Sequence, residues 1–139
     1  MRPPFEIIEH PADVGFLAYG STLEELFANA ALAMMSLGYE LDAIEERQRR
    51  EISAEGRDTE ELLFEWLSDI LAISDAEKLV FRRFEIAELG AGRIRGAAWG
   101  EKFDRARHRA GTYIKAVTYH QFRIEKKEEG WTAQVYLDV

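Results

Sequence analysis

The sequence contains no cysteine. Disulfide bonds, zinc–thiolate sites and thiol nucleophiles are therefore excluded, and this composition suits a reducing compartment such as the cytoplasm. Proline occurs only at positions 3, 4 and 11, and no Pro- or Gly-rich stretch divides the chain. The 139 residues are therefore predicted to form a single domain, 1–139, which is long enough to bury one sizeable hydrophobic core.

Long hydrophobic runs are absent as well. No segment approaches the roughly 20 apolar residues of a membrane-spanning helix, and the first residues lack the apolar stretch of a signal peptide. We therefore expect a cytoplasmic protein with no membrane partner. Positive charge is scarce, since 18 Lys and Arg stand against 26 Asp and Glu, a net charge of −8. This balance disfavours direct binding of nucleic acid and suits cation binding or docking on a basic partner.

Several catalytic motifs are missing. Gly90-Ala91-Gly92 lacks the third glycine and the following helix of a dinucleotide-binding loop. The three histidines, His10, His108 and His120, do not have the spacing of a zinc site. No serine lies in the elbow motif of a hydrolase. The common nucleotide, zinc and serine-hydrolase sites are thus not indicated.

The apolar residues that are present follow two periodicities. Helical periodicity predicts one helix that opens at Ser21 or Thr22 and ends near Gly38, and a second that begins after Asp58. Alternating patterns predict strands at residues 5–10, 14–19, 45–54, 79–89, 93–99, 113–126 and 131–139. This order favours an α+β fold, in which two amphipathic helices cover one face of a mixed, largely antiparallel sheet.

Two acidic residues are candidate metal ligands. Asp13 lies at a break between two predicted strands, just before Gly15, and Asp138 lies beside the α-carboxylate of Val139. Neighbouring anions repel unless a cation neutralises them, and hard oxygen ligands suit Ca²⁺ or Mg²⁺. The residues alone leave structural explanations open, namely a turn-stabilising acid for Asp13 and a terminus ordered by strand pairing for Asp138.

Lys115 lies inside an otherwise apolar predicted strand. If its side chain faced inward it would need a carboxylate partner such as Asp13 or Asp138, because an unpaired buried charge is costly. If it faced outward it would carry no such meaning. The charged segments 100–109 and 47–50 are interpreted as solvated surface, with a docking role left open for the basic run 47–50.

Three segments resemble signatures of the archease family. Residues 10–15, His-Pro-Ala-Asp-Val-Gly, are similar to the family's His-Thr-Ala-Asp-x-Gly, with Pro11 in place of the usual threonine. Residues 114–120, Ile-Lys-Ala-Val-Thr-Tyr-His, match a second signature, and residues 137–139, Leu-Asp-Val, resemble the family's ending. The segments occur in order and span essentially the whole chain. Pro11 removes a hydroxyl and an N–H beside the candidate site.

The resemblance implies a protein cofactor that is not itself an enzyme. Archeases activate the tRNA-splicing RNA ligase, which joins 2′,3′-cyclic-phosphate or 3′-phosphate ends to 5′-hydroxyl ends. They promote its GTP-dependent guanylylation and its repeated turnover, and they carry a calcium site. RNA is then expected to be reached only through the ligase.

The resemblance also implies roles for particular residues. The metal ligands would be Asp13, Asp138 and the main-chain oxygens of Val139, with Ca²⁺ or another divalent cation bound. The further functional candidates are Lys115, His10 and Glu101. Two alternatives remain: a small metal-dependent phosphohydrolase that uses Asp13 and Asp138, and a chaperone-like or RNA-associated interaction module.

Overall fold

The computed structural model describes residues 2–9 and 14–139. The predicted helices and strands are present in these ranges, although the strand predicted at residues 113–126 begins only at Ala116. A short 3₁₀ helix, η1 (Leu41–Ala43), was not predicted. The other elements are β1 (Phe5–Glu9), β2 (Val14–Gly20), α1 (Leu23–Gly38), β3 (Gln48–Glu55), α2 (Thr59–Glu77), β4 (Leu79–Gly90), β5 (Arg93–Lys102), β6 (Ala116–Lys127) and β7 (Gly130–Asp138).

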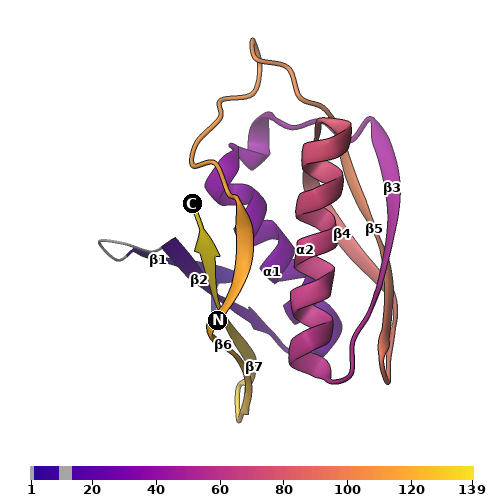
Figure 1. The fold of residues 1–139 in the computed structure, drawn as a ribbon, viewed down its shortest axis with the longest axis vertical. Helices are drawn as coiled ribbons and strands as arrows, with labels where there is room; N and C mark the ends of the chain where they lie inside the picture. Colours follow the sequence, from indigo (N-terminus) through magenta and orange to yellow (C-terminus); the bar gives the residue numbers. More distant parts are fainter. Residues whose placement is uncertain (1, 10–13) are drawn as a thin grey trace.

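The strands form two sheets with the helices between them (Figure 1). One sheet has the strand order β1-β2-β7-β6 and the other β3-β5-β4. Helix α1 packs against β2 and β4, and α2 packs against β3 and β6, so each helix contacts both sheets. The α+β class, with two helices packed on antiparallel strands, is confirmed.

The expectation of one mixed sheet with helices on a single face is wrong. Every strand pair in the described ranges is antiparallel, and the strands divide into two sheets. The physical reason is that both helices carry wide apolar surfaces, which two sheets cover more completely than one. The buried side chains of both sheets and both helices form one core cluster, which includes the fully buried Phe16, Phe27, Trp66 and Phe81.

Both helices begin with the caps that the sequence predicts. The Thr22 side chain accepts a hydrogen bond from the Glu25 N–H at 3.1 Å, and Asp58 accepts one from the Glu61 N–H at 2.8 Å. Glu25 in turn accepts from the Ser21 N–H at 3.2 Å. These bonds satisfy backbone donors that a helix start leaves unpaired, and they fix where each helix enters the space between the sheets.

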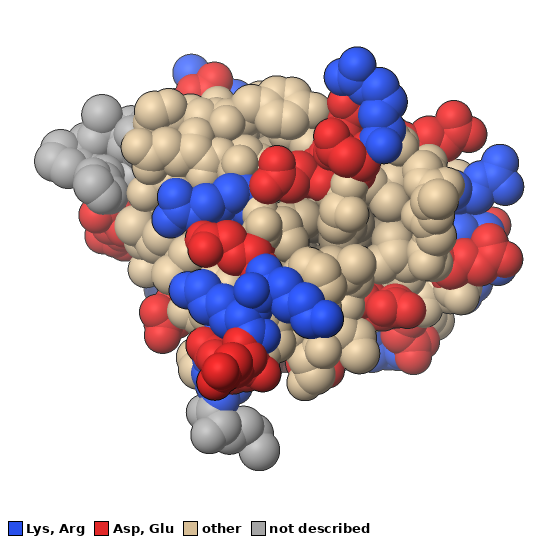
Figure 2. Space-filling view, turned by 90° about the horizontal axis from the view of Figure 1, so that it is seen from below, with Lys and Arg blue, Asp and Glu red and all other residues tan. Residues whose placement is uncertain are grey.

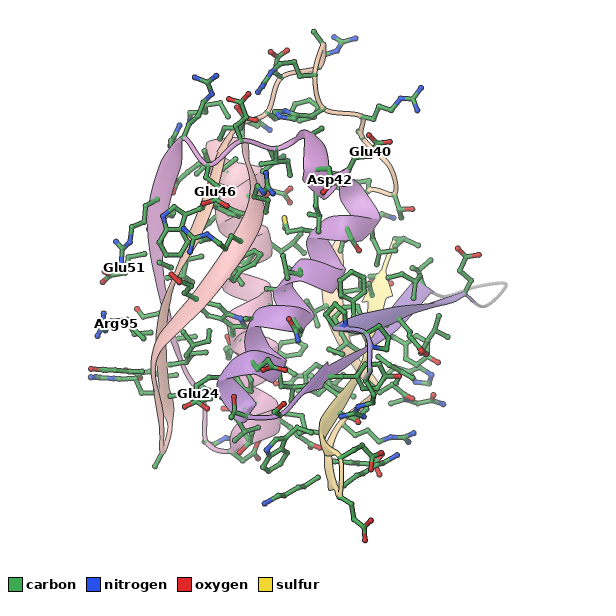
Figure 3. The ribbon with its side chains drawn as sticks, turned by 180° about the vertical axis from the view of Figure 1, so that it is seen from behind. Glu24, Glu40, Asp42, Glu46, Glu51 and Arg95 are labelled. Atoms are coloured by element: carbon green, nitrogen blue, oxygen red, sulfur yellow. The ribbon has the colours of Figure 1, made fainter. Side chains whose placement is uncertain are left out.

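The outer face of the three-stranded sheet is charged but balanced. Figure 3 shows Glu51 and Arg95 at the outer edge of this sheet, away from the helices, and Glu46 contacts Arg82 and Arg83 of β4. The Arg83 guanidinium lies 3.7 Å from the centre of the Trp99 ring and 2.9 Å from Glu46 Oε1. Other arginines on this face form similar ion pairs with glutamates, so the face combines aromatic surface with neutralised charge.

The basic run 47–50 follows the same pattern. Arg47 pairs with Glu45, Arg49 lies 3.8 Å from Glu51, and Arg50 lies 2.9 Å from Glu77. Figure 2 likewise shows acidic and basic side chains interspersed over the face it presents. The run therefore offers no unbalanced positive stripe of the kind that binds phosphates. None of the helices in the described ranges is long and apolar enough to cross a membrane.

Candidate functional site

The C-terminal strand β7 lies in the middle of the four-stranded sheet. It pairs with β2 on one side, where Val14 is opposite Leu137, and with β6 on the other, where Ala116 is opposite Asp138. A Cβ atom on Gly15 would lie 2.5 Å from the Val135 carbonyl oxygen, so glycine is required for this approach of β2 to β7. Strand pairing on both sides thus accounts for the order of the terminus.

The end of β7 nevertheless leaves acidic groups exposed. Asp138 is exposed, and Val139 is 43% exposed. The backbone carbonyl of Asp138 accepts a hydrogen bond from the Lys115 N–H at 2.7 Å. The second signature segment and the terminal one therefore lie side by side, although residues 121–136 separate them in the sequence.

Lys115 itself lies one residue before β6, and its side chain is exposed. The prediction that it lies inside a strand is therefore wrong, because the chain joins the sheet only at Ala116. An exposed ammonium needs no buried carboxylate partner. Its position beside Asp138 comes from the backbone hydrogen bond between the two residues.

The other proposed ligand, Asp13, lies outside the described residues, as does His10. Within the described ranges, no group of three or more His, Cys, Asp or Glu side chains could hold a metal ion. The Asp138 carboxylate and the Val139 main-chain oxygens are adjacent hard oxygen donors on an exposed strand end. They fit part of a calcium shell, and completing that shell requires further oxygen ligands.

Glu101 lies in a different part of the molecule, on β5 of the three-stranded sheet. It is only 3% exposed, and its carboxylate is surrounded by donors. Oε2 accepts from the Glu45 N–H at 2.7 Å and lies 2.9 Å from His108 Nε2, while Oε1 contacts the Arg107 guanidinium. Burial raises the pKa of Glu101, but these hydrogen bonds outweigh it and lower the pKa from 4.5 to about 2.

The same cluster contains His108, whose side chain is fully buried. Its Nδ1 accepts a hydrogen bond from the Asp104 N–H at 2.8 Å, so the Nε2–H is the donor of the hydrogen bond to Glu101 Oε2. The interpretation of residues 100–109 as solvated surface is wrong for Glu101 and His108. Together they tie the connector between β5 and β6 to the sheet, a role that no local pattern indicates.

The comparisons with known proteins agree with the resemblance. Residues 5–139 match the archease protein family. Protein archease of Methanosarcina mazei is 41% identical over 139 residues, which cover 97% of this chain and 95% of that protein. Protein archease of Pyrococcus abyssi is 39% identical over 140 residues, which cover 97% of this chain and 98% of that protein.

Solved structures share the fold. The solution structure of Methanobacterium thermoautotrophicum protein 1598 has a TM-score of 0.82 and 33% identity, covering 98% of this chain and 99% of that chain. A Thermotoga maritima protein, described as an archease and a possible chaperone, has a TM-score of 0.66 and 24% identity, covering 100% of this chain and 98% of that chain. Because the family match spans residues 5–139, this chain belongs to the archease family.

Proposed function

We propose that this protein is an accessory protein that activates the tRNA-splicing RNA ligase by promoting its GTP-dependent guanylylation and its repeated turnover. The observation that carries the proposal is the hydrogen bond between Lys115 and Asp138, which brings two archease signature segments together at an exposed acidic strand end. An exposed acidic end suits contact with another protein better than enclosure of a small substrate.

The proposed metal ligands are Asp13, Asp138 and the main-chain oxygens of Val139. Chain connectivity supports this set, since Asp13 immediately precedes Val14, and Val14 pairs with Leu137. The bound Ca²⁺, or another divalent cation, would supply positive charge where guanylyl transfer on the ligase develops negative charge. Asp13, Asp138 and Val139 would hold that charge at the exposed end of β7.

A metal-dependent phosphohydrolase and direct RNA binding have less support, whereas a chaperone-like interaction module stays an alternative prediction. A metal-dependent phosphohydrolase needs a second metal cluster or a general base beside its metal, and residues 2–9 and 14–139 contain no group of three or more His, Cys, Asp or Glu that could hold a metal ion. Direct RNA binding is disfavoured by the net charge of −8 and by the pairing of the basic run with carboxylates. We therefore expect RNA to be reached through the ligase.

A time course of ligase guanylylation tests the proposed function. The cognate ligase is incubated with labelled GTP, with and without this protein, and the covalent guanylate is counted. The expected result is a faster course and continued ligation beyond one turnover when the protein is present. Identical courses with and without the protein would contradict the proposal, as would GTP or phosphoester hydrolysis by the isolated protein that depends on Asp13.

Calcium is expected to stabilise the isolated protein. A ligand that binds only the folded state stabilises it by about 2.7 kcal/mol when its concentration is one hundred times its dissociation constant. The midpoint of thermal unfolding is therefore measured in calcium and in chelator, with magnesium as a comparison. The midpoint is expected to rise in calcium for the wild-type protein and to stay unchanged for Asp138→Ala. A calcium response of equal size in both proteins would remove Asp138 from the ligand set.

A further inference from the structure

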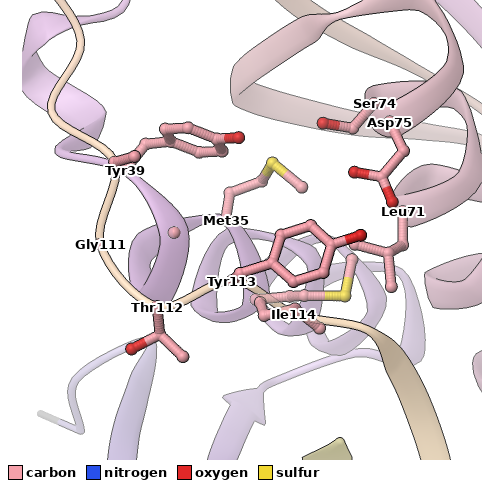
Figure 4. A pocket seen from close by; sticks show the side chains of 12 residues that line it. Met35, Tyr39, Leu71, Ser74, Asp75, Gly111, Thr112, Tyr113 and Ile114 are labelled. Atoms are coloured by element: carbon pink, nitrogen blue, oxygen red, sulfur yellow. The ribbon is translucent and has the colours of Figure 1, made fainter. Parts of the chain in front are cut away.

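A pocket of about 80 Å³ lies near the C-terminal ends of α1 and α2, against residues 110–114 (Figure 4). Backbone hydrogen bonds close one side, where the Gly111 N–H donates to the Gly38 carbonyl at 2.7 Å and the Thr112 N–H donates to the Leu37 carbonyl at 3.0 Å. The apolar part of the lining comes from Met34, Met35, Leu71 and Ile114. The pocket is thus a fixed feature of the fold, held between two helices and a connector.

Two phenol rings and one carboxylate also line this pocket. Figure 4 shows the Tyr39 and Tyr113 side chains with their hydroxyls directed to the same side as Asp75. Burial raises the pKa of the Tyr39 phenol, and the negative charge of Asp75 raises it further, so the two groups interact electrostatically. Tyr113 is 66% exposed, which is unusual for a large aromatic residue beside a pocket.

No described lysine or arginine forms an ion pair with Asp75. Two cations near this end of α2 are engaged with Glu77, since Lys102 Nζ donates to its carbonyl at 2.8 Å and Arg50 pairs with its side chain, while Lys78, which caps α2, is exposed. The last turn of α1 carries no basic residue, so the negative end of its dipole is not offset by a side-chain cation of that turn. Among the described residues, Asp75 is the only charged residue that lines the pocket, so the lining itself carries a negative charge.

These groups select the chemistry of a ligand. An anion would be repelled by Asp75, and a purely apolar ligand would displace water from this exposed carboxylate without replacing its hydrogen bonds. A guanidinium can stack on a tyrosine ring and donate two parallel hydrogen bonds to a carboxylate, while its alkyl stem covers methionine and leucine side chains. An arginine side chain combines all of these features.

We propose that this pocket binds an arginine side chain of the RNA ligase and so anchors the two proteins. The identity of the partner rests on the proposed function, whereas the binding chemistry rests on the pocket alone. Ile114 lines the pocket, and the next residue, Lys115, is hydrogen-bonded to Asp138. The pocket therefore lies next to the Asp138 end of β7.

The first test uses the isolated protein and N-ethylguanidinium as the probe. Binding is followed by NMR through the methyl groups of Met34 and Met35, which line the pocket. Saturable shifts with a dissociation constant of roughly millimolar order are expected for so small a probe. Asp75→Asn is expected to weaken binding at least about five-fold, whereas Asp42→Asn, at an exposed position on η1, leaves it unchanged. Absence of shifts, or tighter binding of butylammonium, would overturn the arginine assignment.

The second test uses the ligase itself. The concentration of this protein that gives half-maximal guanylylation is expected to rise about ten-fold for Asp75→Asn and for Tyr113→Ala, with the maximal rate retained. Asp42→Asn is the matched control and is expected to behave like the wild-type protein. The Asp75 and Tyr113 side chains are exposed, so both variants are expected to fold, and thermal unfolding checks this.

The outcomes separate the two proposals. If the wild-type protein does not stimulate the ligase, the proposed function fails, and the NMR titration still decides whether the pocket binds guanidinium. If stimulation is normal and Asp75→Asn keeps the wild-type half-maximal concentration, the arginine anchor is overturned while the proposed function stands.

Discussion

Asp138→Ala is expected to abolish the stimulation of ligase guanylylation and to leave the fold intact. The side chain is exposed, and the contacts of Asp138 that support the fold are made by its backbone, through the pairing with Ala116 and the hydrogen bond from Lys115. Alanine keeps these backbone bonds and removes the proposed metal ligand. Asp13→Ala is expected to have the same effect. The initial rate of guanylylation is measured with each variant, and circular dichroism checks the fold.

The control for this prediction is Asp42→Asn, which removes one negative charge from another exposed position. It separates the loss of a ligand from a general change in net charge. Asp138→Asn is a further comparison, because it keeps the size of the side chain but weakens an oxygen ligand. Full stimulation by Asp13→Ala or Asp138→Ala would mean that the acidic end of β7 does not activate the ligase.

Glu101→Ala is expected to lower the free energy of unfolding by about 3 kcal/mol, because it leaves buried donors without their acceptor. His108 Nε2 and the Glu45 N–H both donate to Glu101, and Arg107 pairs with it. Urea unfolding followed by tryptophan fluorescence measures the change. Glu85→Ala, on the neighbouring strand with a 60% exposed side chain, is the control and is expected to cost less than about 1 kcal/mol. Equal losses in the two variants would contradict a structural role for Glu101.

The pH dependence of stability gives a second measure of the Glu101 cluster. Its pKa is about 2 in the folded protein and 4.5 ordinarily, so the unfolded state takes up a proton first as the pH falls. The stabilisation is fully present above about pH 4.5 and is lost progressively as the pH falls through about 2. Glu101→Gln does not titrate, so its stability is expected to fall less steeply in this window. Parallel pH profiles for the two proteins would contradict this assignment.

Local features of the fold could be predicted well. The capping boxes at Thr22 and Asp58, the two apolar helix faces and the alternating strands each depend on residues within a few positions of one another. Such patterns act through backbone hydrogen bonds and side-chain periodicity, which are already present in a short segment. The division of the strands into two sheets could not be predicted in this way, because strand partners are chosen by burial across the whole chain.

The candidate site, too, could be predicted only in part from the sequence. Asp138, Val139 and Lys115 were selected from the sequence because acidic chain ends and signature segments are visible there, whereas the hydrogen bond that joins Lys115 to Asp138 depends on β6 pairing with β7. The arginine pocket had no sequence signal, since Tyr39, Asp75 and Tyr113 come from three separate segments. In the same way, the local sequence pattern indicates that Glu101 and His108 are surface residues, whereas both are buried in the folded protein. The sequence determines which chemical groups the protein carries. Distant residues come together, and burial changes their pKa values, only when the sheets and helices pack against one another.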